Sequence, residues 1–142
     1  MKRPKDQYVV IVGCGRLGGY LANELSRAGH AVVAIDADAE AFHNLSVVYS
    51  GFHVEGDATE LAVLKQAKVG KADLVIATTR DDNINLMVAQ VAKAEFGVKR
   101  VLARVFDPKR EPVYQRLGVE TICPTAIAGD LFLKALAKEE TS

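Results

Sequence analysis

Three glycines near the N-terminus constrain the fold of this chain more than any other feature. Gly13, Gly15 and Gly18 follow the spacing G-x-G-x-x-G and come directly after a short apolar run at 8–12 that is rich in β-branched residues. A run of this kind bounded by glycine predicts a buried parallel strand. In this spacing the first glycine permits a tight turn, the second leaves room for a pyrophosphate beside the backbone, and the third lets a helix pack on the strand.

The residues after the glycines complete a strand–helix–strand unit. Leu17, Leu21 and Leu25 recur at helical spacing, so we expect a helix that begins inside the glycine run and points its N-terminus at the loop. The unpaired N–H groups there form an anion site. A second apolar strand at 31–35 leads to Asp36, whose carboxylate can accept hydrogen bonds from both ribose hydroxyls. We interpret this stretch as a dinucleotide-type site; the alternative is a glycine turn without a ligand.

The composition fits one globular domain and argues against binding by bulk charge. Of the 142 residues, 49% are hydrophobic and 25% charged, which is typical of folded domains. Lys plus Arg and Asp plus Glu each number 18, so we expect no nucleic-acid partner. A signal peptide and a membrane-spanning stretch of roughly 20 apolar residues are both missing, and two cysteines suggest neither disulfides nor a metal site. We expect a cytoplasmic protein without direct membrane insertion.

Short apolar runs alternate with amphipathic segments along the rest of the chain. We expect further strands at 51–56, 73–77, 99–105 and 119–123, and helices at 38–48, from 57 or 59 to 67, from 81 or 82 to 96, at 108–117 and at 125–137. This alternation predicts an α/β fold: a single Rossmann-type domain with a doubly wound, parallel six-stranded sheet in the order 3-2-1-4-5-6. The ligand cleft is then expected at the switch point between strands 1 and 4.

Further motifs follow the glycine loop in a fixed order. They are GCGRLG (13–18), IDAD (35–38), GDAT (56–59), KADLVIATTRDDNINL (71–86), ARVFDP (103–108) and LGVETICP (117–124). Over 7–136 the chain resembles the regulator-of-potassium-conductance (RCK) domain, also called KTN or the TrkA N-terminal domain. Such domains form the cytosolic nucleotide-sensing part of potassium channels, uptake systems and efflux antiporters. The resemblance implies a regulator of potassium transport that binds NAD(H) or an adenine nucleotide (ATP, ADP or AMP).

The resemblance and the positions at strand ends together predict the residues that bind this cofactor. They are Gly13, Gly15, Arg16, Leu17, Gly18, Asp36, Ala37, Asp57, Ala58, Thr78, Thr79 and Arg104. The resemblance places the glycines at the phosphates and Asp36 at the adenosine ribose. It places Asp57 and Ala58 at the adenine edge, and Thr79 at the phosphate or ribose side.

Several polar residues of this region allow two interpretations. Arg16 is a credible phosphate clamp in a loop built for anions, or a solvated side chain at a helix start. Arg104 either faces the cleft or forms a structural salt bridge. Asp82 and Asn85 are expected to cap a helix rather than contact a ligand. Because Ala37, and not an arginine, follows the acid at the end of the second strand, we expect NAD or an adenine nucleotide rather than NADP.

The sequence has no pattern that indicates an active site. The three histidines are poorly placed for general acid–base chemistry, and no nucleophile–base pair occurs. Cys14 lies at an expected helix N-terminus, where a thiol pKa can fall, but we interpret it as a small filler. We predict no catalytic residue and no enzyme. The alternative is a small NAD-dependent oxidoreductase or its cofactor-binding fragment, which would need a proton donor beside the nicotinamide.

The last expected helix carries more apolar surface than a single buried stripe requires, and such surface marks an interface. In the resembling family the corresponding helix crosses between two subunits, so we expect a homodimer. Its contacts are assigned to Ile127, Leu131, Phe132 and Leu136. The resemblance also implies a larger ring and a membrane-embedded potassium channel or transporter subunit, which would hold the chain at the inner face of the membrane.

The expected organisation has four parts. They are a tail at 1–6, a nucleotide-binding core at 7–123, the crossover and dimerisation helix at 124–138 and a tail at 139–142. Many members of the family continue into a second, C-terminal ligand-binding domain. We therefore expect either a short form of the family or a piece of a larger protein.

Overall fold

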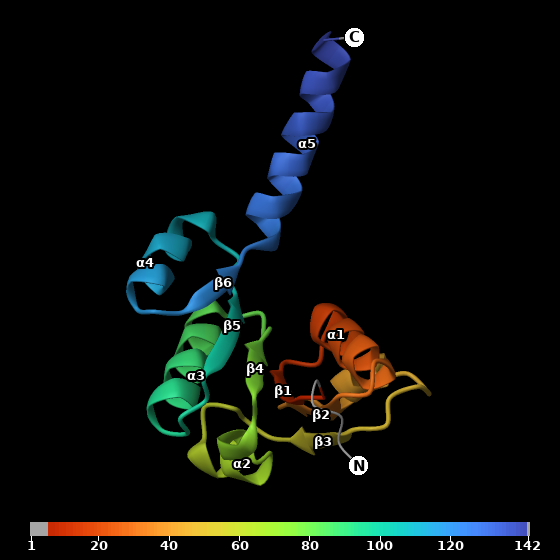
Figure 1. Ribbon diagram of the computed structural model, residues 1–142, viewed down its shortest axis with the longest axis vertical. Helices are drawn as coiled ribbons and strands as arrows, with labels where there is room; N and C mark the ends of the chain where they lie inside the picture. Colours follow the sequence, from red (N-terminus) through yellow and green to blue (C-terminus); the bar gives the residue numbers. More distant parts are fainter. Residues whose placement is uncertain (1–5, 142) are drawn as a thin grey trace.

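The computed structural model describes residues 6–141, so most of the predicted N-terminal tail and the last residue lie outside the described part. Its six strands form one sheet in the order β3-β2-β1-β4-β5-β6, and every neighbouring pair is parallel (Figure 1). The strands are β1 (Tyr8–Val12), β2 (Ala31–Asp36), β3 (Phe52–Glu55), β4 (Leu74–Ala77), β5 (Arg100–Arg104) and β6 (Glu120–Ile122). The predicted Rossmann-type fold and strand order are confirmed.

Helices connect the strands and extend beyond the last one. The α-helices are α1 (Arg16–Arg27), α2 (Leu61–Gln66), α3 (Asp82–Ala94), α4 (Glu111–Arg116) and α5 (Pro124–Thr141). Three short 3-10 helices are η1 (Ala39–Asn44), η2 (Val69–Lys71) and η3 (Pro108–Arg110). Between residues 6 and 141, no helix is long and apolar enough to span a bilayer. The helix α5 extends away from the body, as Figure 1 shows, and continues past the predicted end at 137.

Helices on both faces of the sheet bury an apolar core. Successive side chains of a strand point to opposite faces, so Val10 and Val12 of β1 pack in the cluster that includes residues of α2, α3 and α4. Val9 and Ile11 pack on the other face with Ala22 of α1. These four side chains of β1 are fully buried, which explains why this part of the strand is continuously apolar rather than alternating.

The register of β1 brings the ends of the central strands to one level. Val12 lies beside Ile35 of β2 and beside Ala77 of β4, and Ala77 lies beside Ala103 of β5. The loops that follow these strands therefore emerge along one edge of the sheet.

The segment after β2 is not the predicted helix at 38–48; only η1 forms there. Asn44 ends it, because its side-chain Nδ2 donates a hydrogen bond to the backbone carbonyl of Cys14 at 3.0 Å. The N–H of Ser46 is taken by the Asn23 side chain of α1 at 2.9 Å. Side chains of this type compete with the helix for backbone groups, and here they tie the segment to α1 and to the glycine loop.

The helix α2 also begins later than predicted, at Leu61 instead of Asp57 or Thr59. The Asp57 side chain accepts hydrogen bonds from both the N–H and the Oγ1 of Thr59, at 2.8 and 2.7 Å. This local turn replaces the first helical turn. The other predicted boundaries of the core elements differ from the observed ones by a few residues, which is usual at frayed ends.

The contact between α1 and the glycine loop predicts unequal effects of two alanine substitutions. A Cβ atom at Gly18 would lie 1.8 Å from the Gly13 carbonyl oxygen, whereas a Cβ at Gly15 would meet nothing within 4 Å. We expect Gly18→Ala to lower the free energy of unfolding by roughly 3 kcal/mol, because α1 must move off the strand. Gly15→Ala should stay within about 1 kcal/mol of the parent. Urea unfolding followed by circular dichroism measures both, and equal stabilities would refute the packing role of Gly18.

Candidate functional site

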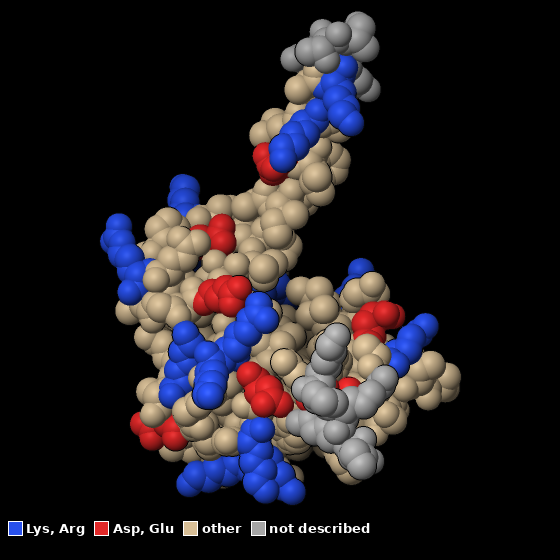
Figure 2. All heavy atoms as spheres, viewed as in Figure 1, with Lys and Arg blue, Asp and Glu red and all other residues tan. Residues whose placement is uncertain are grey.

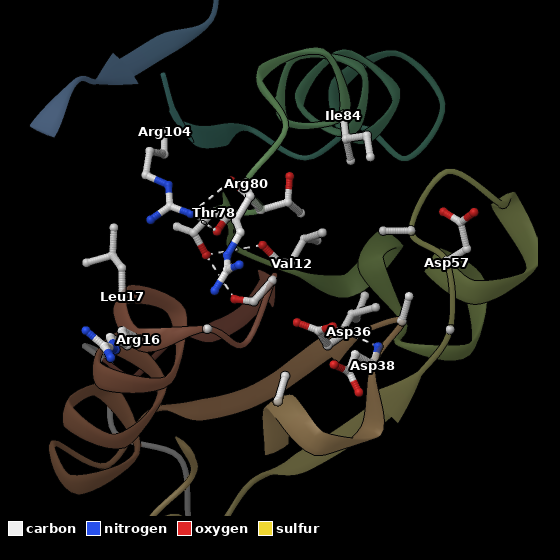
Figure 3. Close-up of a pocket in the computed structure, with 18 of the residues that line it drawn as sticks. Val12, Arg16, Leu17, Asp36, Asp38, Asp57, Thr78, Arg80, Ile84 and Arg104 are labelled. Atoms are coloured by element: carbon white, nitrogen blue, oxygen red, sulfur yellow. Dashed lines mark hydrogen bonds between the residues drawn. The ribbon is translucent and has the colours of Figure 1, made fainter. Parts of the chain in front are cut away.

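A cleft of about 760 Å³ opens at the C-terminal ends of the strands, over the switch point between β1 and β4 (Figure 3). Every predicted cofactor-binding residue except Gly18 lines it. Its other lining residues, which the sequence prediction missed, are Val12, Ile35, Asp38, Ala41, Gly56, Arg80, Ile84 and Phe106. Most of these directly precede or follow predicted residues, so their position at the end of a predicted strand could have indicated that they line the cleft. Ala41 and Ile84 depend on how η1 and α3 fold back over the edge, which the local sequence does not indicate.

The glycine loop forms the floor of the cleft. Gly13 has a φ of +98°, a conformation that glycine adopts without the steric cost of a side chain. Gly18 packs beneath the loop against Gly13 and the Thr78 hydroxyl, so the structure places it behind the cleft rather than in its lining. Its contribution is therefore the close approach of α1 to β1.

The N-terminus of α1 faces this loop, and no side chain among residues 6–141 caps it. Gly15 occupies the N-cap position, makes no side-chain capping bond, and is followed by no acidic residue in the first turn. The first N–H groups of a helix have no partner within the helix and carry the positive end of its dipole. The space above Gly15 is also open. This arrangement leaves backbone donors and room for an anionic group.

Asp36 lies on the opposite wall and is fixed by two backbone donors. Its Oδ2 accepts a hydrogen bond from the Cys14 N–H at 2.8 Å, and its Oδ1 accepts one from the Asp38 N–H at 2.9 Å. The carboxylate therefore joins β2 to the glycine loop as well as lining the cleft. Burial and, to a smaller extent, the charge of Asp36 together raise the pKa of the Cys14 thiol to about 11. This supports the interpretation of Cys14 as a filler rather than a reactive thiol.

Asp57 and Ala58 continue this wall beyond β3. Asp57 is exposed, and its hydrogen bonds with the hydroxyl and N–H of Thr59 hold the pKa of its carboxyl below the ordinary value. Ala58 is buried and lines the cleft with its small side chain.

A buried amide organises the loop after β4. The fully buried Asn85 side chain accepts hydrogen bonds from the Thr79 N–H at 2.9 Å and from the Thr79 Oγ1 at 2.6 Å. Its Nδ2 donates to the carbonyls of Thr79 and Arg104, each at 3.0 Å. Asn85 thereby links the ends of β4 and β5. The Thr78 hydroxyl adds a bond to the Gly13 carbonyl at 3.0 Å, which connects β4 to the glycine loop.

The predicted capping roles of Asp82 and Asn85 are wrong. Asp81 caps α3 instead, because its Oδ1 accepts hydrogen bonds from the N–H groups of Asn83 and Ile84. The Asp82 Oδ1 accepts a bond from the Phe106 N–H at 2.8 Å, so it holds the loop after β5. Three polar residues at one helix start therefore divide between capping and tertiary contacts, a division that sequence position alone does not decide.

Arg104 faces the cleft, one of the two alternatives that the sequence left open. Its Nη2 donates to the carbonyls of Thr78 and Thr79 at 2.6 and 2.9 Å, and its Cζ lies 4.5 Å from the centre of the Phe106 ring. Its Nε is buried and has no partner among residues 6–141. Burial lowers the pKa of the Arg104 guanidinium, and the charge of Arg80 lowers it further, while Asp82 opposes both.

Two more arginines lie at the cleft. Arg16 is exposed at the start of α1 and lies beside Leu17 at the rim. Arg80 follows Thr79 in the loop after β4, and in Figure 3 its side chain extends over the cleft below Arg104. Three guanidinium groups therefore border one cleft. Those of Arg16 and Arg80 permit bidentate contacts with phosphate, whereas the Nη2 of Arg104 is already bonded to two carbonyls.

The chain is similar in sequence to proteins of potassium uptake and in fold to several solved structures. The Trk system potassium uptake protein TrkA of Streptomyces coelicolor is 39% identical over 129 residues, which cover 91% of this chain and 58% of that relative. The chain therefore spans about three fifths of the length of this curated relative.

Two examples illustrate the solved structures that share the fold. The TrkA-N domain of the inner membrane protein ybaL from Escherichia coli superposes with a TM-score of 0.80 at 18% identity, covering 94% of this chain and 99% of that one. A GsuK channel bound to NAD superposes with a TM-score of 0.81 at 24% identity, covering 99% of this chain and 25% of that one.

The family model of the TrkA-N domain matches residues 9–124, from the second residue of β1 to the first residue of α5. This range contains the whole cleft described above. With the glycine loop, the strand order and the similar proteins in agreement, the chain belongs to the TrkA-N domain family.

Proposed function

We propose that this chain is a nucleotide-binding regulatory module of a potassium transport system, acting on the cytosolic side of a membrane-embedded channel or transporter. The observation that carries the proposal is the open, uncapped N-terminus of α1 at the glycine loop, opposite the fixed carboxylate of Asp36. Membership of the TrkA-N family and the similarity to a potassium uptake protein supply the transport context.

The cleft suits the parts of an adenine nucleotide in a definite order. Phosphates would accept hydrogen bonds from the free N–H groups of α1, where a Cβ at Gly15 would occupy their space. The ribose hydroxyls would donate to Asp36, and the base would lie against Asp57 and Ala58. NAD(H), ATP, ADP and AMP all share this adenosine end, and the structure of a GsuK channel bound to NAD is consistent with such a ligand.

A 2′-phosphate fits this wall poorly. Asp36 is followed by Ala37 and Asp38, so two carboxylates and no cation line this stretch of the cleft. A phosphate beside them would be repelled by like charge and would lack a partner. We therefore favour NAD or an adenine nucleotide over NADP.

Binding without turnover is the role that we propose for the cleft. Neither histidine, lysine, cysteine nor tyrosine lines it within residues 6–141, and its ionisable groups are aspartates and arginines. Hydride transfer between a nicotinamide and an alcohol or carbonyl needs a group that moves a proton near neutral pH. The oxidoreductase alternative therefore has no specific support in the cleft.

The helix α5 supports a homodimer. The exposed fractions of Ile127, Leu131 and Phe132 are 52%, 61% and 78%. Exposed large apolar side chains that cluster in this way usually mark an interface. Figure 2 shows the charged side chains of α5 along one side of the helix, with the rest of its visible surface uncharged. Ile122 of β6 is also exposed, so the apolar surface continues from the sheet edge into the helix. A second copy would cover it.

We propose that the nucleotide acts through this dimer by population shift. A ligand that binds one arrangement of the two subunits more tightly than another favours that arrangement, and a membrane partner can respond to it. A larger ring built from such dimers is compatible with this scheme. The ligand must have different affinities for the two arrangements, because equal affinities would transmit nothing.

The first prediction from this proposal concerns Gly15. Gly15→Ala places a methyl group where the phosphates would lie, so we expect the dissociation constant of a bound nucleotide to rise by about tenfold or more, equivalent to roughly 1.4 kcal/mol. Calorimetric titration with NADH, NAD, ATP, ADP and AMP measures it, with turnover assayed in parallel. Unchanged affinity for the ligands that bind the parent protein would exclude the glycine loop as the phosphate site.

The second prediction concerns the dimer. Leu131→Asp places a charge in the apolar surface of α5, so we expect the protein to shift from dimer to monomer in sedimentation velocity. Gln66→Asp is the matched control: it introduces the same residue and the same change of charge at an exposed position of α2, away from α5. A dimer that survives Leu131→Asp, or dissociates equally with Gln66→Asp, would contradict the assigned interface.

A further inference from the structure

Charge is separated along the cleft in the order of the strands. Asp57 follows β3, and Asp36 and Asp38 end or follow β2, so the carboxylates lie at one end. The glycine loop, which carries Arg16 at the rim of the cleft and no acidic residue, follows β1 in the middle. Arg80 follows β4 and Arg104 ends β5, so these guanidinium groups lie at the other end. Neighbouring strands are about 4.8 Å apart, and the cleft therefore changes from acidic to basic over a few strand spacings.

The glycine loop lies between these two ends, so a bound nucleotide would extend to both sides of it. A nucleotide with its ribose at the carboxylates and its first phosphate at the N-terminus of α1 has its remaining atoms directed toward β4 and β5. In ADP and ATP those atoms are further phosphates. In NAD they are a second ribose and a nicotinamide ring, which is positively charged in the oxidised form. Two guanidinium groups at this end favour the phosphates and repel the cationic ring.

At the basic end of the cleft, formed by Arg80 and Arg104, the side chain of Arg104 is already fixed by contacts within the chain. Arg104 cannot swing away, because its Nη2 is held by the carbonyls of Thr78 and Thr79 and its plane lies against Phe106. The Nε is buried and therefore does not face the open cleft. Because Nη2 is bonded to the two carbonyls, Nη1 is the nitrogen that remains to contact a ligand. In Figure 3 the guanidinium group of Arg104 points from the β5 side of the cleft toward Leu17 on the opposite side.

Arg80 completes this end. It is exposed, and no hydrogen bond or ion pair ties it to another residue between 6 and 141. Two like charges at one end of a cleft repel each other, and an anion between them removes that repulsion. The loop around Arg80 is nevertheless well fixed, because Thr79 is bonded to the buried Asn85.

We infer that Arg80 and Arg104 form a second anion subsite, which makes nucleoside di- and triphosphates the preferred ligands of the cleft over AMP and oxidised NAD. The inference rests on the nucleotide-binding function proposed above and adds the number of phosphates that the cleft recognises. Arg104 supplies a fixed donor beside the glycine loop, and Arg80 closes over the terminal phosphate from the adjacent strand.

The test is the ratio of affinities for ADP and AMP in the parent protein and in Arg80→Gln. We expect the parent to bind ADP and ATP at least tenfold more tightly than AMP, on the order of one charge-assisted contact, and more tightly than NAD. Arg80→Gln should reduce the ADP-to-AMP ratio to near one by weakening ADP. Arg116→Gln removes the same charge from α4, away from the cleft, and should keep the parent ratio. Isothermal titration calorimetry measures all of these constants.

The outcomes separate the two proposals. If AMP binds, but ADP and ATP bind no better than AMP or keep their advantage in Arg80→Gln, the second subsite is refuted and the nucleotide site stands. Tighter binding of NAD than of ADP by the parent protein would refute the subsite as well. If AMP, ADP, ATP, NAD and NADH all fail to bind, the nucleotide-binding function fails and the subsite fails with it.

Discussion

The close approach of α1 to β1 is the constraint on which the site depends. Gly18 lies so near the Gly13 carbonyl that no side chain fits between them, and this contact sets the N-terminus of α1 at the end of the central strand. The carboxylate of Asp36 then holds the Cys14 N–H, which keeps the loop open toward the cleft. Backbone geometry therefore shapes the half of the cleft proposed for the adenosine and first phosphate.

The other half of the cleft is held by side chains. Asn85 uses its buried amide to join the ends of β4 and β5, and Asp82 fixes the loop after β5 through the Phe106 N–H. A buried amide with all of these bonds made is rigid, whereas a buried polar group left unpaired would be costly. Arg104 is positioned by the same loop, so the charge of this half is presented at a defined place.

The sequence predicted those features that depend on local spacing. The glycine loop, Asp36 and the strand order follow from short motifs whose geometry is set within a few residues or by the handedness of the crossovers. The helix expected at 38–48 and the caps assigned to Asp82 and Asn85 were wrong, because tertiary hydrogen bonds decide the local conformation there. Arg80 was missed although it adjoins a predicted residue, since its role depends on which strand ends lie together.

Regulation by the proposed ligand requires a physical connection from the cleft to α5, and the chain contains a short one. Phe106 lines the cleft, packs on Arg104 and is bonded to Asp82. Its carbonyl lies 3.9 Å from the Sγ of Cys123, which directly precedes α5. Only Phe106 and Cys123 therefore separate a phosphate bound to Arg104 from the start of α5, the helix proposed to form the dimer. Coupling still requires that the two dimer arrangements hold this layer differently, because proximity alone transfers no free energy.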